Sequence, residues 1–175
     1  MNHTFLLTPK VFCRVCDMHS NGTLLLIRLR IRNTTLEHCS RNAGWQAYVK
    51  NLIDSSSCIR KAAIVGVSDG SMWACSEPPV GDDFTATSEE IKKFVSLFNN
   101  INDVPTTGFV LEGKKYIVPR VEENLIFGKK DKTGVFAVKT KMAVIIACFE
   151  GDSQEGLVCR DSVERIGNYL EQQGY

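Results

Sequence analysis

Met142-Ala143-Val144-Ile145-Ile146-Ala147-Cys148-Phe149 is an apolar run with no polar residue inside it. A strand with one face in water alternates apolar and polar residues, whereas a strand buried on both faces is apolar throughout. Residues 142–149 therefore predict the central and most buried strand of a sheet.

The segments before this run predict further strands at hairpin spacing. Short strand-like runs lie at about 108–112, 114–120, 124–129 and 133–140. Turn residues separate them at Glu112-Gly113-Lys114 and over 131–134. Pro119 falls inside the second run. Because proline has no backbone N–H to donate, we expect an edge, a bulge or a strand end there.

Three segments have the periodicity of amphipathic helices. Their apolar stripes are Trp45, Tyr48, Val49 and Leu52; Ile91, Phe94, Val95 and Phe98; and Val163, Ile166, Tyr169 and Leu170. Thr87 and Glu90 predict a capping box before the second stripe. The third helix is predicted over 158–173, after a loop at 151–156 and before Gly174.

Two apolar runs at 61–67 and 71–76 flank Asp69-Gly70, which is a strong hairpin signal. Residues 99–107 read as a loop. The resulting order is helix, hairpin, helix, antiparallel meander, helix. It predicts an α+β fold with helices packed on a sheet.

Residues 1–42 differ in composition from the rest of the chain. They carry six basic residues against two acidic ones, together with all three histidines. Strand-like alternation occurs only at 23–32, and a single strand is not stable alone. We expect 1–42 to be a disordered or loosely held extension and 43–175 to be the folded domain.

The extension contains residue types that bind zinc. Cys13-x-x-Cys16 is followed by His19 and by His38-Cys39. A second ligand pair at standard spacing is missing, so unpaired thiols are the favoured interpretation and we predict no metal site.

Charge and cysteine content indicate a cytosolic protein. The net charge of +1 gives no case for nucleic-acid binding. The seven cysteines are odd in number and irregularly spaced, which favours free thiols in a reducing compartment. No signal peptide is evident, because Pro9-Lys10 interrupts the first apolar run.

The common catalytic motifs are missing. The sequence has no Gly-rich phosphate loop, no Gly-x-Ser-x-Gly and no His-Glu-x-x-His, and 43–175 contains no histidine. We predict a binding protein without enzymatic activity or cofactor. The rival hypothesis is an enzyme with Cys148 or Cys159 as nucleophile, which requires a thiol of low pKa.

Aromatic residues near both ends of the domain suggest a recognition surface. Trp45 and Tyr48 lie one helical turn apart, and the chain closes with Tyr169 and Tyr175. Each could be a core residue. If the first and last helices pack side by side, however, the rings form an exposed strip. Such a strip suits proline-rich ligands, because flat rings pack on pyrrolidine rings and their N–H and O–H groups donate to free carbonyls.

Basic residues gather around the later strands. They are Lys114, Lys115, Arg120, Lys129, Lys130, Lys132, Lys139 and Lys141. They form either a solvated rim of the sheet or a surface for an acidic partner, such as a protein or the inositol phosphates of a membrane.

The motifs, taken in order, resemble the profilin family. They are Gly44-Trp45-Gln46-Ala47-Tyr48-Val49, Ala62-Ala63-Ile64-Val65-Gly66, Trp73-Ala74, Gly108-Phe109, Gly113, Lys115-Tyr116, Arg120, Gly128-Lys129-Lys130, Thr140, Val144-Ile145-Ile146, Val163-Glu164-Arg165-Ile166-Gly167-Asn168-Tyr169-Leu170 and Gln173-Gly174-Tyr175. The resemblance covers about 43–175 and is greater to the shorter plant, fungal and invertebrate forms. The extension 1–42 is atypical of the family.

The resemblance implies a central antiparallel sheet with helices on both faces. It also implies a cytoplasmic and cytoskeletal protein that binds monomeric actin, proline-rich proteins and phosphoinositides, and that regulates actin polymerisation. Carried over by position, the polyproline-binding residues are Trp45, Tyr48, Trp73, Tyr169 and Tyr175. The actin-binding residues are Lys115, Val118, Arg120, Lys129, Arg160 and Glu164. The phosphoinositide-binding residues are Arg120, Lys129 and Lys130.

The alternative is a proline-rich-peptide binding module with weak or no actin binding. Pro119 and residues 151–162 depart from the commoner profilin pattern on the side that would face actin.

Overall fold

Residues 143–149 of the apolar run belong to β7 (Ala143–Glu150) in a computed structural model that describes residues 43–175. Met142, the first residue of the run, lies before the strand and is exposed. Every residue of β7 from Ala143 to Phe149 is buried. Ile145 and Ala147 belong to one hydrophobic core, whereas Val144 and Ile146 belong to a second core on the opposite face. Both faces of β7 are therefore covered, which explains why the strand has no polar face.

The strands described within 43–175 form one antiparallel sheet in the order β2-β1-β7-β6-β5-β4-β3. Their bounds are β1 Ile59–Gly66, β2 Met72–Cys75, β3 Phe109–Leu111, β4 Lys114–Glu122, β5 Leu125–Lys130 and β6 Thr133–Lys139. The prediction of a most buried, interior strand is confirmed for β7, although β6 holds the middle position in the sheet.

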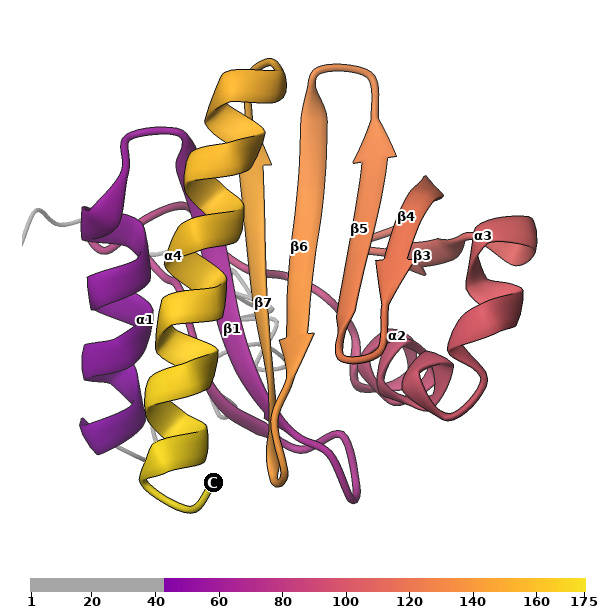
Figure 1. Cartoon of the computed structure of the whole chain (residues 1–175). Helices are drawn as coiled ribbons and strands as arrows, with labels where there is room; N and C mark the ends of the chain where they lie inside the picture. Colours follow the sequence, from indigo (N-terminus) through magenta and orange to yellow (C-terminus); the bar gives the residue numbers. More distant parts are fainter. Residues whose placement is uncertain (1–42) are drawn as a thin grey trace, which may run out of the picture. The chain divides into compact units, whose positions relative to one another are not determined.

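Helices pack on both faces of the sheet (Figure 1). The long helices α1 (Ala43–Ser55) and α4 (Ser153–Gln172) lie side by side on one face. On the other face are α2 (Ser88–Ser96), α3 (Val104–Thr107) and the 3-10 turns η1 (Leu97–Asn99) and η2 (Ile101–Asp103). The prediction of a loop at 99–107 was wrong, because η2 and α3 lie within it. The predicted α+β fold is confirmed.

The predicted capping box begins α2. The backbone N–H of Glu90 donates to Thr87 Oγ1 at 3.2 Å, and the N–H of Thr87 donates to Glu90 Oε2 at 2.9 Å. The second carboxylate oxygen of Glu90 accepts from the N–H of Gly113 at 2.7 Å. One side chain therefore both caps α2 and ties it to the β3–β4 turn.

The predicted start of the last helix was wrong, because residues 151–156 are not all loop. Asp152 caps α4 by accepting from the N–H of Gln154 at 2.7 Å, and the N–H of Asp152 donates to Glu155 Oε2 at 3.1 Å. Gly156, which ends the predicted loop, lies inside α4 against the sheet. A Cβ there would stand 3.2 Å from Phe149 Cζ. This glycine allows close packing instead of marking a turn.

Pro119 lies at an irregularity in β4, as predicted. The pairing between β4 and β5 shifts register between Ile117 and Arg120. The shift accommodates the missing N–H of proline. Beyond it, Arg120 pairs directly with Phe127 of β5, so the bulge determines which residues meet at this end of the sheet.

Among the described cysteines, Cys58, Cys148 and Cys159 are free and buried; Cys75 is not one of these free thiols. Burial raises the pKa of Cys148 to about 12 and also raises that of Cys159. A nucleophilic cysteine needs the opposite shift and access to substrate, so the enzyme hypothesis based on these two thiols has no support.

The predicted extension 1–42, with its alternative zinc ligands, lies outside the described residues. Among the helices of residues 43–175, none combines the length and the hydropathy that crossing a membrane requires.

Gly128 of β5 provides a test of the packing. A Cβ at this position would lie 2.4 Å from Phe109 Cζ, in a ring that stacks on Tyr116 with centroids 5.2 Å apart. Gly128→Ala is expected to lower the free energy of unfolding by about 1–3 kcal/mol, because the added methyl overpacks the core. Urea denaturation measures this loss.

The matched control is Gly44→Ala in α1. A Cβ on Gly44 meets nothing within 4 Å, and alanine favours helix more than glycine does. This variant should keep or raise stability, and an equal loss in both variants would contradict the packing argument.

Candidate functional site

The five residues predicted to bind polyproline form one aromatic cluster. Trp45 lies at its centre, with ring centroids 4.8 Å from Trp73, 4.9 Å from Tyr175 and 5.6 Å from Tyr48. Tyr48 in turn lies 6.0 Å from Tyr169. The aromatic cluster therefore joins α1, β2, α4 and the residue that ends the chain.

The aromatic cluster is a surface and not a part of the core. Tyr169 and Tyr175 are 47% and 41% exposed. Trp45, Tyr48 and Trp73 are half-buried, and they pack against the core between the sheet and the α1–α4 layer. Rings anchored on one side and open to solvent on the other offer a ligand a preformed apolar surface.

The end of α4 holds Tyr175 in place through a Schellman motif. The N–H of Tyr175 donates to the carbonyl of Leu170 at 2.9 Å, and the N–H of Gly174 donates to that of Glu171 at 3.0 Å. Gly174 has a φ of 94°, a conformation that side chains disfavour. The reversal of the chain at Gly174 turns Tyr175 back onto Trp45.

The β1–β2 turn orients the indole of Trp73, a role that the sequence patterns did not reveal. Trp73 Nε1 donates to Ser71 Oγ at 3.2 Å, and Ser71 Oγ donates to Asp69 Oδ1 at 2.8 Å. The backbone N–H and hydroxyl of Ser71 lower the pKa of Asp69. Asp69 thus remains an ionised acceptor at neutral pH.

The phenol of Tyr48 stays protonated at neutral pH. Burial raises its pKa above 10, and the neighbouring Tyr169 raises it further through charge repulsion and a side-chain hydrogen bond. A protonated phenol can donate a hydrogen bond to a carbonyl oxygen.

A second surface lies where α4 passes the strands β5 and β6. Its centre is a pocket of about 190 Å³ lined by Arg120, Lys129, Arg160, Leu157 and Phe127, among others. We call it the charged pocket. Its floor consists of stacked rings, because Phe127 lies 4.5 Å from Phe136, which lies 5.7 Å from Phe149.

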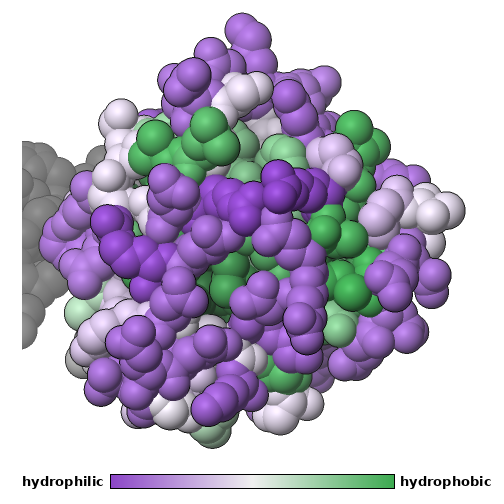
Figure 2. All heavy atoms as spheres, in the orientation of Figure 1, coloured by the Kyte–Doolittle hydropathy of each residue, from purple (hydrophilic) through white to green (hydrophobic). Residues whose placement is uncertain are grey.

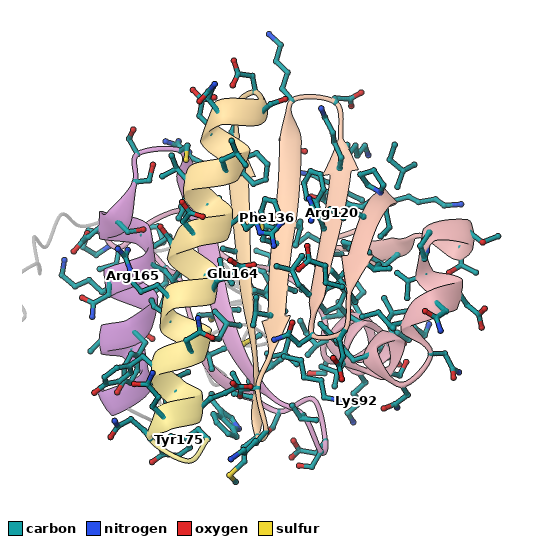
Figure 3. The ribbon with its side chains drawn as sticks, viewed as in Figure 1. Lys92, Arg120, Phe136, Glu164, Arg165 and Tyr175 are labelled. Carbon is teal, nitrogen blue, oxygen red and sulfur yellow. The ribbon has the colours of Figure 1, made fainter. Side chains whose placement is uncertain are left out.

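Carboxylates organise the arginines of the charged pocket. Glu122 accepts from Arg160 Nη2 at 2.9 and 3.0 Å and pairs with Arg120 Nη2 at 2.8 Å. Arg160 Nε also donates to Glu164 at 2.9 Å. The hydrogen bond to Glu164 is the first cause of the raised pKa of Arg160. Figure 3 shows Arg120, Phe136 and Glu164 gathered beside α4.

The remaining residues predicted on this surface are not all brought together. Val118 is only 4% exposed and belongs to the core under α2, so its side chain offers no contact surface. Lys115 lines a different groove, next to α2. Lys130 follows Lys129 along β5, so the alternation of the strand directs it to the opposite face of the sheet. Of the three residues predicted to bind phosphoinositides, Arg120 and Lys129 therefore share one surface and Lys130 lies on another.

The sequence patterns missed several exposed apolar residues, of which Ile117 and Leu157 are the most exposed. Ile117 on β4 is 67% exposed and Leu157 on α4 is 58% exposed. Figure 2 shows hydrophobic surface over the strands that α4 leaves uncovered, bordered by hydrophilic side chains. Exposed apolar area rimmed by charges is typical of a protein-binding surface.

The family model described as Profilin matches residues 43–175. The chain belongs to the profilin family. Over 133 residues it is 52% identical to "Profilin-2" and 47% identical to "Profilin-1" of Caenorhabditis elegans, in each case over 76% of this chain and 99% of the relative. The profilin of Drosophila melanogaster is 34% identical over 132 residues, 75% of this chain and 99% of the relative.

Solved profilins share the fold. Profilin IA of Acanthamoeba castellanii superimposes with a TM-score of 0.65 at 32% identity, over 75% of this chain and 99% of its own. Mouse profilin IIa, solved in complex with a double repeat from the FH1 domain of mDia1, has a TM-score of 0.59 at 25% identity, over 76% of this chain and 100% of its own.

Gly174→Ala tests how the aromatic cluster of this profilin is held. Alanine at a φ of 94° is strained, so the Schellman motif should open and release Tyr175 from Trp45. We expect a loss of about 1 kcal/mol in stability and a changed tryptophan emission. The free energy of unfolding and the tryptophan emission are measured on the same sample.

The control is Gly113→Ala, which has the same kind of strain at a φ of 70° and equally open space, but lies in the β3–β4 turn. Gly113→Ala should lower the free energy of unfolding by a similar amount and leave the tryptophan emission unchanged. If both variants left the emission unchanged, Tyr175 would not depend on the Schellman motif.

Proposed function

We propose that this profilin-family chain binds monomeric actin and proline-rich segments and thereby regulates actin polymerisation in the cytoplasm and cytoskeleton, without catalysis. The aromatic cluster is the observation that carries the proposal. Five rings from separated parts of the sequence meet on one surface, and three of them share contacts with Trp45. The mouse profilin IIa solved with a proline-rich FH1 repeat supports the same ligand class.

The chemistry of the aromatic cluster matches a polyproline II helix. Such a helix has no internal hydrogen bonds, so its carbonyls are free to accept. Its pyrrolidine rings pack on flat aromatic faces, and little conformational entropy is lost because the helix is already formed. Tyr48, protonated at neutral pH, is a suitable donor, and the exposed Tyr169 and Tyr175 flank the contact area.

A proline-rich peptide should change tryptophan fluorescence on titration, because Trp45 and Trp73 would lie under the ligand. Trp45→Ala removes the central ring and should weaken binding by about thirtyfold or more, the loss expected of a hot-spot aromatic. Calorimetry gives the affinities.

Leu157→Ala is the control for this experiment. It truncates an exposed apolar residue of α4 that lies at the charged pocket instead of the aromatic cluster. The Leu157→Ala variant should bind the peptide with the affinity of the wild type. No response of the wild-type chain at millimolar peptide would end the proline-binding proposal.

For actin, we propose the surface around the charged pocket. Ile117 and Leu157 supply exposed apolar area, and Arg120, Lys129, Arg160 and Glu164 surround it with charge. A central apolar area with a charged rim is the general anatomy of protein interfaces. Lys115 stays in the proposal as a peripheral contact, and Val118 is left out because it is buried.

We also propose that phosphoinositides bind at Arg120 and Lys129, which line the same pocket. Two cationic side chains at one opening suit a multiply phosphorylated headgroup. Lys130 lies on the other face of β5 and is not part of this proposed site. Actin and phosphoinositides would then compete for one surface.

Lys129→Glu tests both proposals. Lys129 is exposed and has no ion pair among residues 43–175, so the fold should persist. We expect weaker suppression of spontaneous nucleation in a pyrene-actin assay and weaker sedimentation with vesicles that contain phosphatidylinositol bisphosphate. Lys141→Glu, in the β6–β7 turn, is the charge-matched control and should behave as the wild type in both assays.

One observation favours the alternative of a proline-binding module with weak or no actin binding. Glu122 and Glu164 already neutralise Arg120 and Arg160, which reduces the positive charge available to a partner. Unchanged nucleation at an equimolar ratio of wild-type chain to actin would select this alternative.

A further inference from the structure

The aromatic cluster continues into a groove between α1 and α4. The groove has a volume of about 330 Å³ and is lined by Tyr48, Asn51, Arg165, Ile166 and Tyr169. Two of these residues, Tyr48 and Tyr169, also belong to the aromatic cluster. Figure 3 shows Arg165 on the side of α4 that faces α1. A ligand lying across Tyr48 and Tyr169 would therefore meet Arg165 next.

The guanidinium of Arg165 has no ion-pair partner among residues 43–175. Arg160, one and a half turns earlier on α4, is held by Glu122 and Glu164. Arg165 is exposed and has no ion pair or hydrogen bond from its side chain to any residue of 43–175. Asp161 borders an adjoining hollow of α4 together with Arg165, but the two side chains form no ion pair.

Among the other charges beside the groove, Asp161 lies about one turn before Arg165 without an ion pair to it, and the remaining ones are paired elsewhere. On α1, Asp54 is paired with Lys50, and Glu164 on α4 is engaged by Arg160. Asn51, the remaining polar residue of the groove, is neutral and carries an amide that can donate. The end of the aromatic strip beyond Tyr48 and Tyr169 thus presents two hydrogen-bond donors, the Asn51 amide and the positively charged guanidinium of Arg165.

Resting on the proposed proline binding, we propose that Arg165 selects proline-rich segments carrying an Asp or Glu side chain at the end of the proline run that lies over Tyr48 and Tyr169. The planar guanidinium donates two parallel hydrogen bonds that match a carboxylate. The aromatic cluster supplies the affinity for proline, and Arg165 supplies the preference among proline-rich partners. Because the site is exposed, the preference is modest and falls as salt rises.

The experiment compares blocked decaproline peptides, acetylated and amidated so that their termini carry no charge. One has no flanking residue, and the others carry a single Asp or a single Asn at either end. With wild-type chain at low salt, one Asp peptide should bind about two- to fivefold more tightly than its Asn counterpart. The difference should shrink in high salt.

Three variants test whether the preference for the Asp peptide over the Asn peptide depends on Arg165. Arg165→Gln should bind decaproline as the wild type does and should not distinguish Asp from Asn, whereas Arg165→Glu should bind the Asp peptide more weakly than the Asn peptide. Lys132→Gln removes one exposed charge from the β5–β6 turn and should keep the wild-type preference.

The outcomes separate this inference from the function on which it rests. If decaproline does not bind the wild-type chain, the proposed function fails, and the inference with it. If decaproline binds but the Asp and Asn peptides are equal, or if the preference survives in Arg165→Gln, the inference alone is overturned.

Discussion

The burial of β7 on both faces is the constraint on which the rest of the structure depends. A strand without a polar face must be covered by two separate layers, and the alternation of β7 contributes to two cores. One layer is α1 with α4, and the other is α2, α3 and the turns between them. The first helix and the last helix of the domain become neighbours because both cover the same face of the sheet.

This neighbourhood creates the aromatic cluster. Trp45 and Tyr48 come from α1, whereas Tyr169 lies near the end of α4 and Tyr175 follows that end. No single helix or strand carries enough of these rings to form the whole surface. The Schellman motif at Gly174 completes the arrangement by turning the last residue back onto α1.

Much of the fold followed from local patterns. The capping box of Thr87, the hairpin at Asp69-Gly70 and the irregularity at Pro119 are local chemistry, and each was predicted from a few neighbouring residues. The early start of α4 was missed: Gly156 fell in the predicted loop, although it lies in the helix, where the absence of a side chain leaves room for Phe149. That contact joins residues of different elements and has no local pattern.

By itself, the sequence determined the α+β class, the order of elements, the buried strand β7 and the identity of the five aromatic residues. The tertiary structure alone decided which residues share a surface. It buried Val118, placed Lys130 on the opposite face from Lys129, and left Arg165 without an ion pair among residues 43–175 while Arg160 was neutralised. The physical reason is that helix and strand periodicities are local, whereas burial and charge pairing depend on which distant segments the sheet brings together.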